Sequence, residues 1–181
     1  MISLLSSILF TNIIYLISGK LFTKKSIVNF KDFAEISING FIYISFLALL
    51  INFFISLNVT INSLIFFFIC LIYLLKKKSF EKRELITLVI LSLFCFLIIL
   101  FDTVNRPDAA LYHLPFTRIL NEEKIIFGLT NLHFRYGHVS IIQYSSAINK
   151  NYLFGDIGIL IPLISIYGLL IFNFISYINY Y

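Results

Sequence analysis

Five long apolar runs, separated by polar connections, dominate the hydrophobic pattern of the chain. They cover Ile2–Ser18, Ile36–Leu57, Ile61–Leu75, Leu85–Phe101 and Ile157–Tyr177. Because a helix that crosses a bilayer needs roughly 20 mostly apolar residues, each run predicts a transmembrane helix. We therefore expect an all-α, polytopic membrane protein with about five spans, in which residues 102–156 form one long polar loop.

Composition supports the membrane prediction. Hydrophobic residues make up 60% of the chain, charged residues 13%, and the mean hydropathy is +0.95. A soluble domain has about 25% charged residues, and a fold of this size buries only about 70% of the surface of its unfolded chain. The apolar surplus must therefore contact lipid or partner subunits. The net charge of +5 lies in short blocks beside the apolar runs, a pattern that does not indicate nucleic acid binding.

The distribution of Lys and Arg predicts the orientation in the membrane. The connections after the first and third runs are short and hold nine basic residues: Lys20, Lys24, Lys25, Lys31, Lys76, Lys77, Lys78, Lys82 and Arg83. The long loop holds only five: Arg106, Arg118, Lys124, Arg135 and Lys150. Short loops rich in basic residues face the cytoplasm. We expect the N-terminus and the loop outside a bacterial inner membrane, and the C-terminus in the cytoplasm.

Two short helices are expected within the loop. Pro115 fits the first turn of a helix in which Phe116, Ile119 and Leu120 share one apolar face and Thr117 points elsewhere. A second helix is expected from Ser140 to Ile148. Both are predicted to be interfacial helices that lie along the membrane surface.

The loop also holds the candidate catalytic residues. Asp108 is a candidate general base, and the alternative is that it caps a short helix. His113 and His133 are candidate acid–base or phosphate-binding groups, and the alternative for each is an interfacial hydrogen bond. His133 and His138 are five residues apart, a spacing that does not support a metal site on one helix face.

Two arginines and an asparagine are candidate substrate-binding residues. Arg118 and Arg135 match the oxygens of a lipid phosphate or pyrophosphate, because a guanidinium binds them through two hydrogen bonds. The alternative is contact with ordinary lipid headgroups. Asn131 would position a ligand or simply fill the interface.

The segment from Asp108 to Ser140 resembles a signature in a poorly characterised family of polytopic bacterial inner-membrane proteins. Members show an Asp, a Leu-Tyr-His-Leu, a Gly-Leu-x-Asn-Leu-His-x-Arg and a nearby Ser, which correspond here to Asp108, Leu111–Leu114, Gly128–Arg135 and Ser140. The family is similar to the GT-C class of integral-membrane glycosyltransferases. Those enzymes take sugars from polyprenyl-phosphate carriers and use an acidic residue in an outward-facing loop.

The resemblance implies a role for each matching residue. Asp108 would be the base or a carboxylate that orients a divalent metal, His113 and His133 its polar partners, Arg135 the phosphate contact and Asn131 an orienting group. GT-C enzymes are longer and carry the acidic motif after their first helix. We therefore expect further membrane subunits or a C-terminal half.

These observations favour a glycosyltransferase that uses a polyprenyl-phosphate-linked sugar in contact with membrane lipid. The alternative is a non-catalytic subunit or a polysaccharide assembly or export component. A transporter is less favoured, because the charged residues lie outside the spans or at their edges. The asparagines inside the spans are expected to bond to neighbouring helices: Asn12, Asn39, Asn52 and Asn173.

Overall fold

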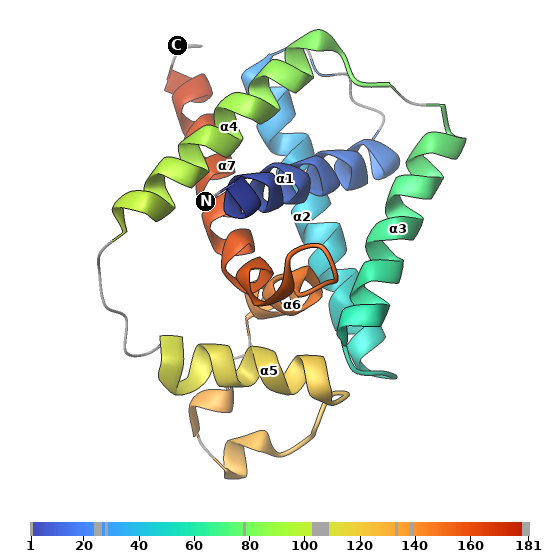
Figure 1. The fold of residues 1–181 in the computed structure, drawn as a ribbon, viewed down its shortest axis with the longest axis vertical. Coiled ribbons are helices and arrows are strands. Elements are labelled where there is room, and N and C mark those ends of the chain that lie inside the picture. Colours follow the sequence, from blue (N-terminus) through green and yellow to red (C-terminus); the bar gives the residue numbers. More distant parts are fainter. Residues whose placement is uncertain are drawn as a thin grey trace.

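The computed structural model describes residues 2–23, 27, 29–77, 79–102, 109–132, 134–137 and 140–178. Within these residues the fold is entirely helical, as predicted (Figure 1). The α-helices are α1 (Ile2–Phe22), α2 (Phe30–Asn52), α3 (Val59–Leu75), α4 (Lys82–Phe101), α5 (Leu114–Glu122), α6 (Ile141–Asn149) and α7 (Ile161–Ile178). Short π or 3₁₀ turns lie between them: η1 (Ala109–His113), η2 (Leu129–Asn131), η3 (Phe134–Gly137) and η4 (Gly155–Leu160).

The five predicted spans all form helices, although they differ in length. Four segments are long and apolar enough to cross a membrane: Ser3–Phe22, Phe30–Asn52, Lys82–Phe101 and Gly155–Ile178. The remaining helix, α3, is apolar but has 17 residues, which makes it roughly 26 Å long. Large apolar side chains on the outer surfaces of α3, α4 and α7 are exposed, among them Phe67, Leu97 and Phe174. Such surfaces suit contact with lipid.

A capping box sets the start of α2 earlier than the apolar pattern predicts. The helix begins at Phe30 rather than Ile36, because Asn29 accepts a hydrogen bond from the Asp32 N–H at 2.8 Å. The Asp32 carboxylate accepts one in return from the Asn29 N–H at 3.3 Å. This reciprocal pairing satisfies two backbone donors at a helix start, so the first turns of α2 form in a charged stretch.

Two glycines let α1 and α2 pack with their backbones in contact. A Cβ atom on Gly40 would lie 1.8 Å from the Tyr15 carbonyl oxygen, and one on Gly19 would lie 1.9 Å from the Ile36 carbonyl oxygen. Small residues at such crossings allow close packing between membrane helices. The close packing of α1 against α2 therefore requires glycine at both positions.

The start of α4 is tied to the end of α1 by a buried ion pair. Lys20 Nζ lies 2.8 Å from Glu84 Oε1 and donates to the Ser79 carbonyl at 3.1 Å. The other Glu84 oxygen accepts from the Glu81 N–H at 2.9 Å, which caps α4. The Glu84 side chain is 3% exposed, so its charge depends on these donors.

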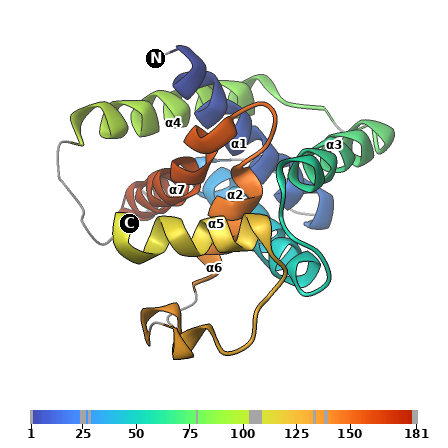
Figure 2. The same cartoon turned by 60° about the horizontal axis from the view of Figure 1, so that its bottom comes forward.

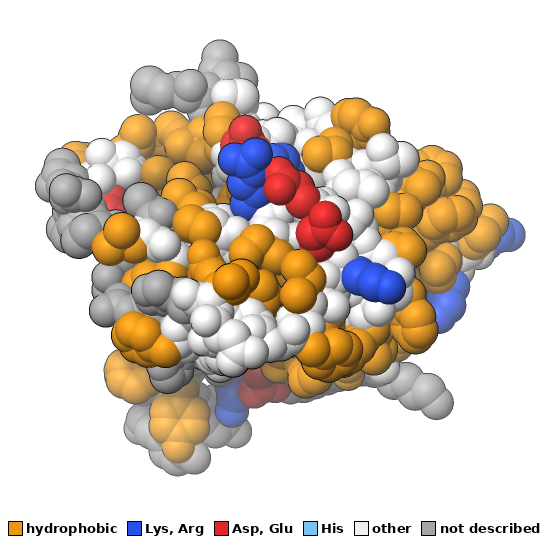
Figure 3. Space-filling view, turned by 90° about the horizontal axis from the view of Figure 1, so that it is seen from below, with side chains coloured by type: hydrophobic (Ala, Val, Ile, Leu, Met, Phe, Trp, Pro, Cys, Tyr) orange, Lys and Arg blue, Asp and Glu red, His pale blue; other side chains and the backbone are white. Residues whose placement is uncertain are grey.

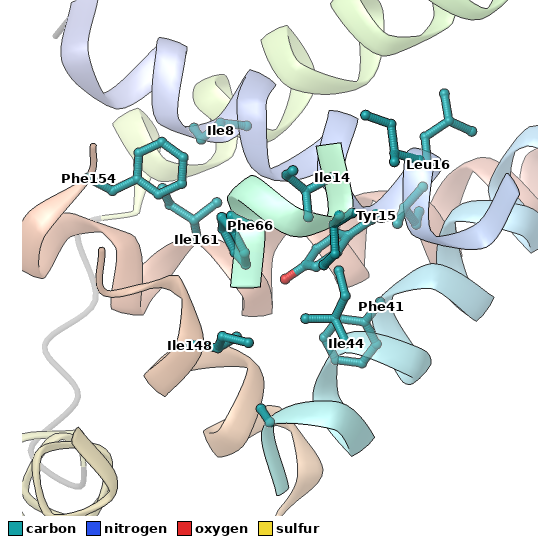
Figure 4. Close-up of a cluster of buried hydrophobic side chains, with 14 of the residues drawn as sticks. Ile8, Ile14, Tyr15, Leu16, Phe41, Ile44, Phe66, Ile148, Phe154 and Ile161 are labelled. Atoms are coloured by element: carbon teal, nitrogen blue, oxygen red, sulfur yellow. The ribbon is translucent and has the colours of Figure 1, made fainter. Parts of the chain in front are cut away.

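The core lies where α1, α2, α6 and α7 meet (Figure 4). Its largest fully buried side chains include Tyr15, Ile44, Ile148 and Ile161. The Tyr15 ring packs edge-on against Phe41 with ring centroids 5.4 Å apart. The Tyr15 hydroxyl shares a 2.9 Å hydrogen bond with Ser145 of α6, so this phenol joins the apolar core to a loop helix.

The position of α6 differs from the expected interfacial helix. A helix forms here as predicted, with Ser140 as its cap, but every residue from Gln143 to Asn149 is buried. The helix is a wedge between α2, α5 and α7 (Figure 2). The difference arises because polar residues of α6 find partners inside the bundle: Ser145 bonds to Tyr15, and Asn149 Nδ2 donates to Thr11 Oγ1.

Candidate functional site

The loop helices α5 and α6 lie together at one end of the bundle (Figures 1 and 2). Asp108 and His133 lie outside the described residues, as does His138. Arg135 belongs to η3, where only its backbone is described. The site is therefore built from His113, Asn131, Arg118 and the residues that position them.

His113 lies at the junction between η1 and α5. η1 is a π turn, a rare element that is frequent at functional sites. Pro115 follows directly, and its missing N–H removes a helical hydrogen bond at this junction. The residue with the predicted catalytic role thus occupies an irregular and exposed helix start.

A hydrogen bond joins His113 to the start of α6. Gln143 Oε1 accepts from the Ser140 N–H at 2.9 Å, so its Nε2 donates to His113 Nδ1 at 3.3 Å. Nδ1 is then an acceptor, and the imidazole carries its proton on Nε2. This tautomer leaves an N–H donor of His113 for a ligand.

Two buried carboxamides fasten α5 and α6 to the α2–α3 turn. Asn62 Nδ2 donates to the carbonyls of Leu57, Ala147 and Lys150 at 2.7, 2.9 and 2.7 Å. Asn121 Nδ2 donates to Leu57 and Ala147 at 2.6 and 2.8 Å. The same two carbonyls therefore accept from both amides. We call Asn62, Asn121, Leu57 and Ala147 the amide clasp.

A third asparagine holds the end of α5. Asn52 Nδ2 donates to the carbonyls of Leu120 and Glu123 at 3.2 and 3.0 Å, and the Asn52 carbonyl accepts from the Ile125 N–H at 2.9 Å. The last carbonyls of a helix have no partner within the helix. Asn52 supplies one. Asn12 Nδ2 donates instead to a side chain, Ser92 Oγ of α4, at 3.1 Å. Both bond to neighbouring helices, as predicted.

The segment between α5 and α6 folds back on α5 and encloses an apolar pocket. The loop pocket, as we name it, has a volume of about 230 Å³. Its walls are α5, residues 124–130, Tyr136, Gly137 and Tyr144. Burial raises the pKa of Tyr144, so its phenol stays protonated. Lys124 is the basic residue of this lining.

Two glycines shape the loop pocket. Gly128 has a φ of +86°, a left-handed conformation that starts η2. A Cβ atom on Gly137 would lie 2.8 Å from the Thr130 side chain, so η2 and η3 pack closely. Asn131 lies on η2 with an exposed side chain. The predicted substrate-binding residue is thus at the outside of the pocket segment.

Arg118 lies on the exposed face of α5 rather than in the loop pocket. Its Nε lies 2.7 Å from Glu122 Oε1, and this hydrogen bond raises the pKa of Arg118. The opposite face of α5 buries Phe116 and Leu120, as predicted, and also Thr117, which was expected to point elsewhere. Thr117 is buried because its hydroxyl donates to the His113 carbonyl at 2.9 Å. Figure 3 shows acidic and basic side chains gathered on this end, flanked by apolar ones.

The predicted divalent metal has no site among the residues that the structure describes. Among the described residues, no group of three or more His, Cys, Asp or Glu side chains is arranged to hold a metal ion. Asp108, the carboxylate that the resemblance assigns to metal or base chemistry, is not among them.

Sequence reasoning gave no role to Asn62 or Asn121, the two amides of the clasp. Asn62 lies within an apolar run, and a carboxamide in such a run was the available signal. For Asn121, which follows an amphipathic stretch in a polar loop, no comparable signal exists in the sequence.

Several apolar helices of spanning length and a buried helical wedge define a multi-pass, all-helical membrane protein. Residues 1–179 match the model of a family described as "Domain of unknown function (DUF8201)". The chain belongs to this family. No curated protein and no solved structure matches it.

Proposed function

We propose that the chain is a GT-C-like glycosyltransferase, or the N-terminal part of one, acting at the outer face of a bacterial inner membrane. Its donor is a sugar linked to a polyprenyl phosphate. One observation supports this most: part of the segment that resembles the family signature lines the apolar loop pocket, through Ile126–Thr130, Tyr136 and Gly137. An isoprenoid chain is apolar, and ligand pockets for such groups have mostly apolar linings.

The polar groups around the loop pocket suit the other end of such a donor. Lys124 is in the lining, His113 offers an N–H donor, and Asn131 is exposed on the pocket segment. Asp108 directly precedes η1 in the sequence, and Arg135 belongs to η3. The proposal assigns these residues to the sugar and phosphate.

The reaction follows from these roles. An acceptor hydroxyl bonds to the anomeric carbon of the sugar and gives its proton to Asp108. The bond from that carbon to the phosphate oxygen breaks, and its electron pair leaves with the carrier phosphate. The transition state resembles an oxocarbenium ion. Arg135 balances the charge of the leaving phosphate, and His113, Asn131 and His133 orient the two substrates.

Binding of the carrier tests the site without knowledge of the sugar. The full chain in lipid nanodiscs is titrated with radiolabelled decaprenyl phosphate. We expect saturable binding that weakens at least tenfold in Arg135→Ala and in Ile119→Phe, which fills the loop pocket. Asp156→Asn is the control, since that carboxylate is 82% exposed and on η4. Equal binding by all variants would refute the site.

Turnover separates the enzyme from the alternative subunit. A panel of decaprenyl-phosphate hexoses is supplied with a crude acceptor fraction, and sugar transfer is measured. Asp108→Asn should retain carrier binding and lose transfer. A chelator distinguishes the two roles of Asp108, because only a metal-orienting carboxylate makes transfer depend on a divalent ion. Binding with no transfer in any condition would favour the non-catalytic subunit.

A further inference from the structure

A second groove lies at the opposite end of the bundle, between the start of α2 and the last turns of α7. It has a volume of about 670 Å³ and combines Lys31 and Glu35 of α2 with an aromatic and apolar stripe of α7. The stripe includes Tyr167, Phe174 and Tyr177, which are half exposed or more. It runs for roughly 15 Å along the helix. We name the groove between α2 and α7 the inner groove.

The charged end of the inner groove carries both signs. Lys31 Nζ is 4.0 Å from Glu35 Oε1, and the two side chains are 38% and 35% exposed. The same ammonium lies 5.5 Å from the centre of the Tyr177 ring. Asp32 is buried in the same turn of α2. The lining of the groove thus places one ammonium beside one carboxylate, while the Asp32 carboxylate accepts from the Asn29 N–H at the helix cap.

This charge pattern selects among membrane lipids. The phosphate of a phospholipid fits beside Lys31, whereas a headgroup whose only charge is that phosphate, as in phosphatidylglycerol, offers no cation to Glu35. A primary ammonium instead pairs with Glu35 and donates hydrogen bonds to it, and an aromatic face such as Tyr177 also attracts cations. We propose that the inner groove binds one phosphatidylethanolamine molecule, with its headgroup at Lys31 and Glu35 and an acyl chain along α7.

The proposal is independent of the carrier-lipid site, because the two sites lie at opposite ends of the bundle (Figure 1). A helix from another chain or a second copy could also cover an apolar stripe, but neither needs a zwitterionic headgroup. The choice of lipid therefore decides between these occupants.

Native mass spectrometry of the full chain in detergent provides the test. Phosphatidylethanolamine and phosphatidylglycerol with identical acyl chains are titrated separately. We expect one phosphatidylethanolamine bound at least fivefold more tightly than phosphatidylglycerol. The preference should vanish in Glu35→Gln, and binding of both lipids should fall in Leu170→Trp, which fills the groove. Glu122→Gln is the matched control, because Arg118–Glu122 is an i,i+4 ion pair outside the groove.

Equal binding of the two lipids, a preference for phosphatidylglycerol, or the same loss in Glu122→Gln would overturn the proposal. So would a dimer that Leu170→Trp dissociates. Should Glu35→Gln fold poorly, the wild-type chain is crosslinked with a photoactivatable phosphatidylethanolamine. Adducts between residues 167 and 177 would support the inner groove, and adducts elsewhere would refute it.

Discussion

At the end of the bundle that holds the loop helices, neutral carboxamides join the elements, whereas at the opposite end the joints are ion pairs and helix caps. Asn62 and Asn121 bind shared carbonyls at the first end, and Lys20 binds Glu84 at the second. Buried neutral amides avoid the large cost of desolvating a charge. The Lys20–Glu84 pair lies at the end where Lys and Arg are concentrated. The two ends should therefore respond differently to mutation.

The largest expected effect is the loss of both amides of the clasp. In Asn62→Ala/Asn121→Ala the carbonyls of Leu57, Ala147 and Lys150 lose their side-chain donors inside the protein. Because an unsatisfied buried polar group costs about 1–3 kcal/mol, we expect a destabilisation of about 4 kcal/mol. Each single variant keeps a donor for Leu57 and Ala147, so the double variant should exceed the sum of the single effects.

A thiol-reactive dye measures this stability during a thermal ramp. Cys95 is fully buried, and in a Cys70→Ser background it reports unfolding alone. If the effects of the single variants add up to that of the double variant, the two amides act separately, and the amide clasp is not a cooperative unit.

The second effect breaks the ion pair between Lys20 and Glu84. Glu84→Gln leaves Lys20, which is 16% exposed, without its carboxylate. Removal of one partner of a fully buried pair costs about 3–5 kcal/mol, and the partial exposure of Lys20 lowers our expectation to about 2 kcal/mol. Lys20→Met/Glu84→Gln should recover part of this loss. A double variant less stable than Glu84→Gln would contradict the ion-pair account.

The helix starts show how much of the fold the sequence predicts. Pro115 and Ser140 marked the starts of α5 and α6, since Pro fits the first helical turn and Ser is a helix cap. The wedge position of α6 was missed because polar residues such as Ser145 find partners only in three dimensions. The Asn29–Asp32 capping box was readable but was overlooked beside the stronger apolar signal.

The candidate site was predictable only as a region. A resemblance singles out residues 108–140 as the candidate region, and some of its described residues line the loop pocket, among them Phe116, Gly128 and Tyr136. Guanidinium chemistry made Arg118 a candidate phosphate contact, but Arg118 lies on the exposed face of α5 and pairs with Glu122. Which face of a helix is exposed depends on the elements that pack against it. The shared carbonyls of the clasp belong to residues 90 apart along the chain, so no local pattern encodes them.

A smaller effect should appear in the pH dependence of stability, through Tyr144 at the end of the bundle that holds the loop helices. Burial raises the pKa of Tyr144 in the folded protein, so the unfolded chain ionises this phenol first, near its ordinary pKa of about 10. The stabilisation is complete below about pH 10 and is lost as the pH rises beyond that value. The melting temperature of Tyr144→Phe should therefore fall less between pH 9 and 11 than that of the wild type. Parallel curves would show that Tyr144 does not contribute to the alkaline loss.

The smallest expected effect concerns Arg118 and sharpens the contrast between stability and binding. Its ion pair with Glu122 lies on the surface, with side chains 76% and 59% exposed, and water and salt screen such pairs. Arg118→Ala should leave the melting temperature unchanged within error, unlike Glu84→Gln at the opposite end of the bundle. A weakened binding of decaprenyl phosphate in the same variant would then identify Arg118 as a phosphate contact, because its fold is intact. Unchanged binding would restrict the phosphate site to the pocket side of α5, where Lys124 lies.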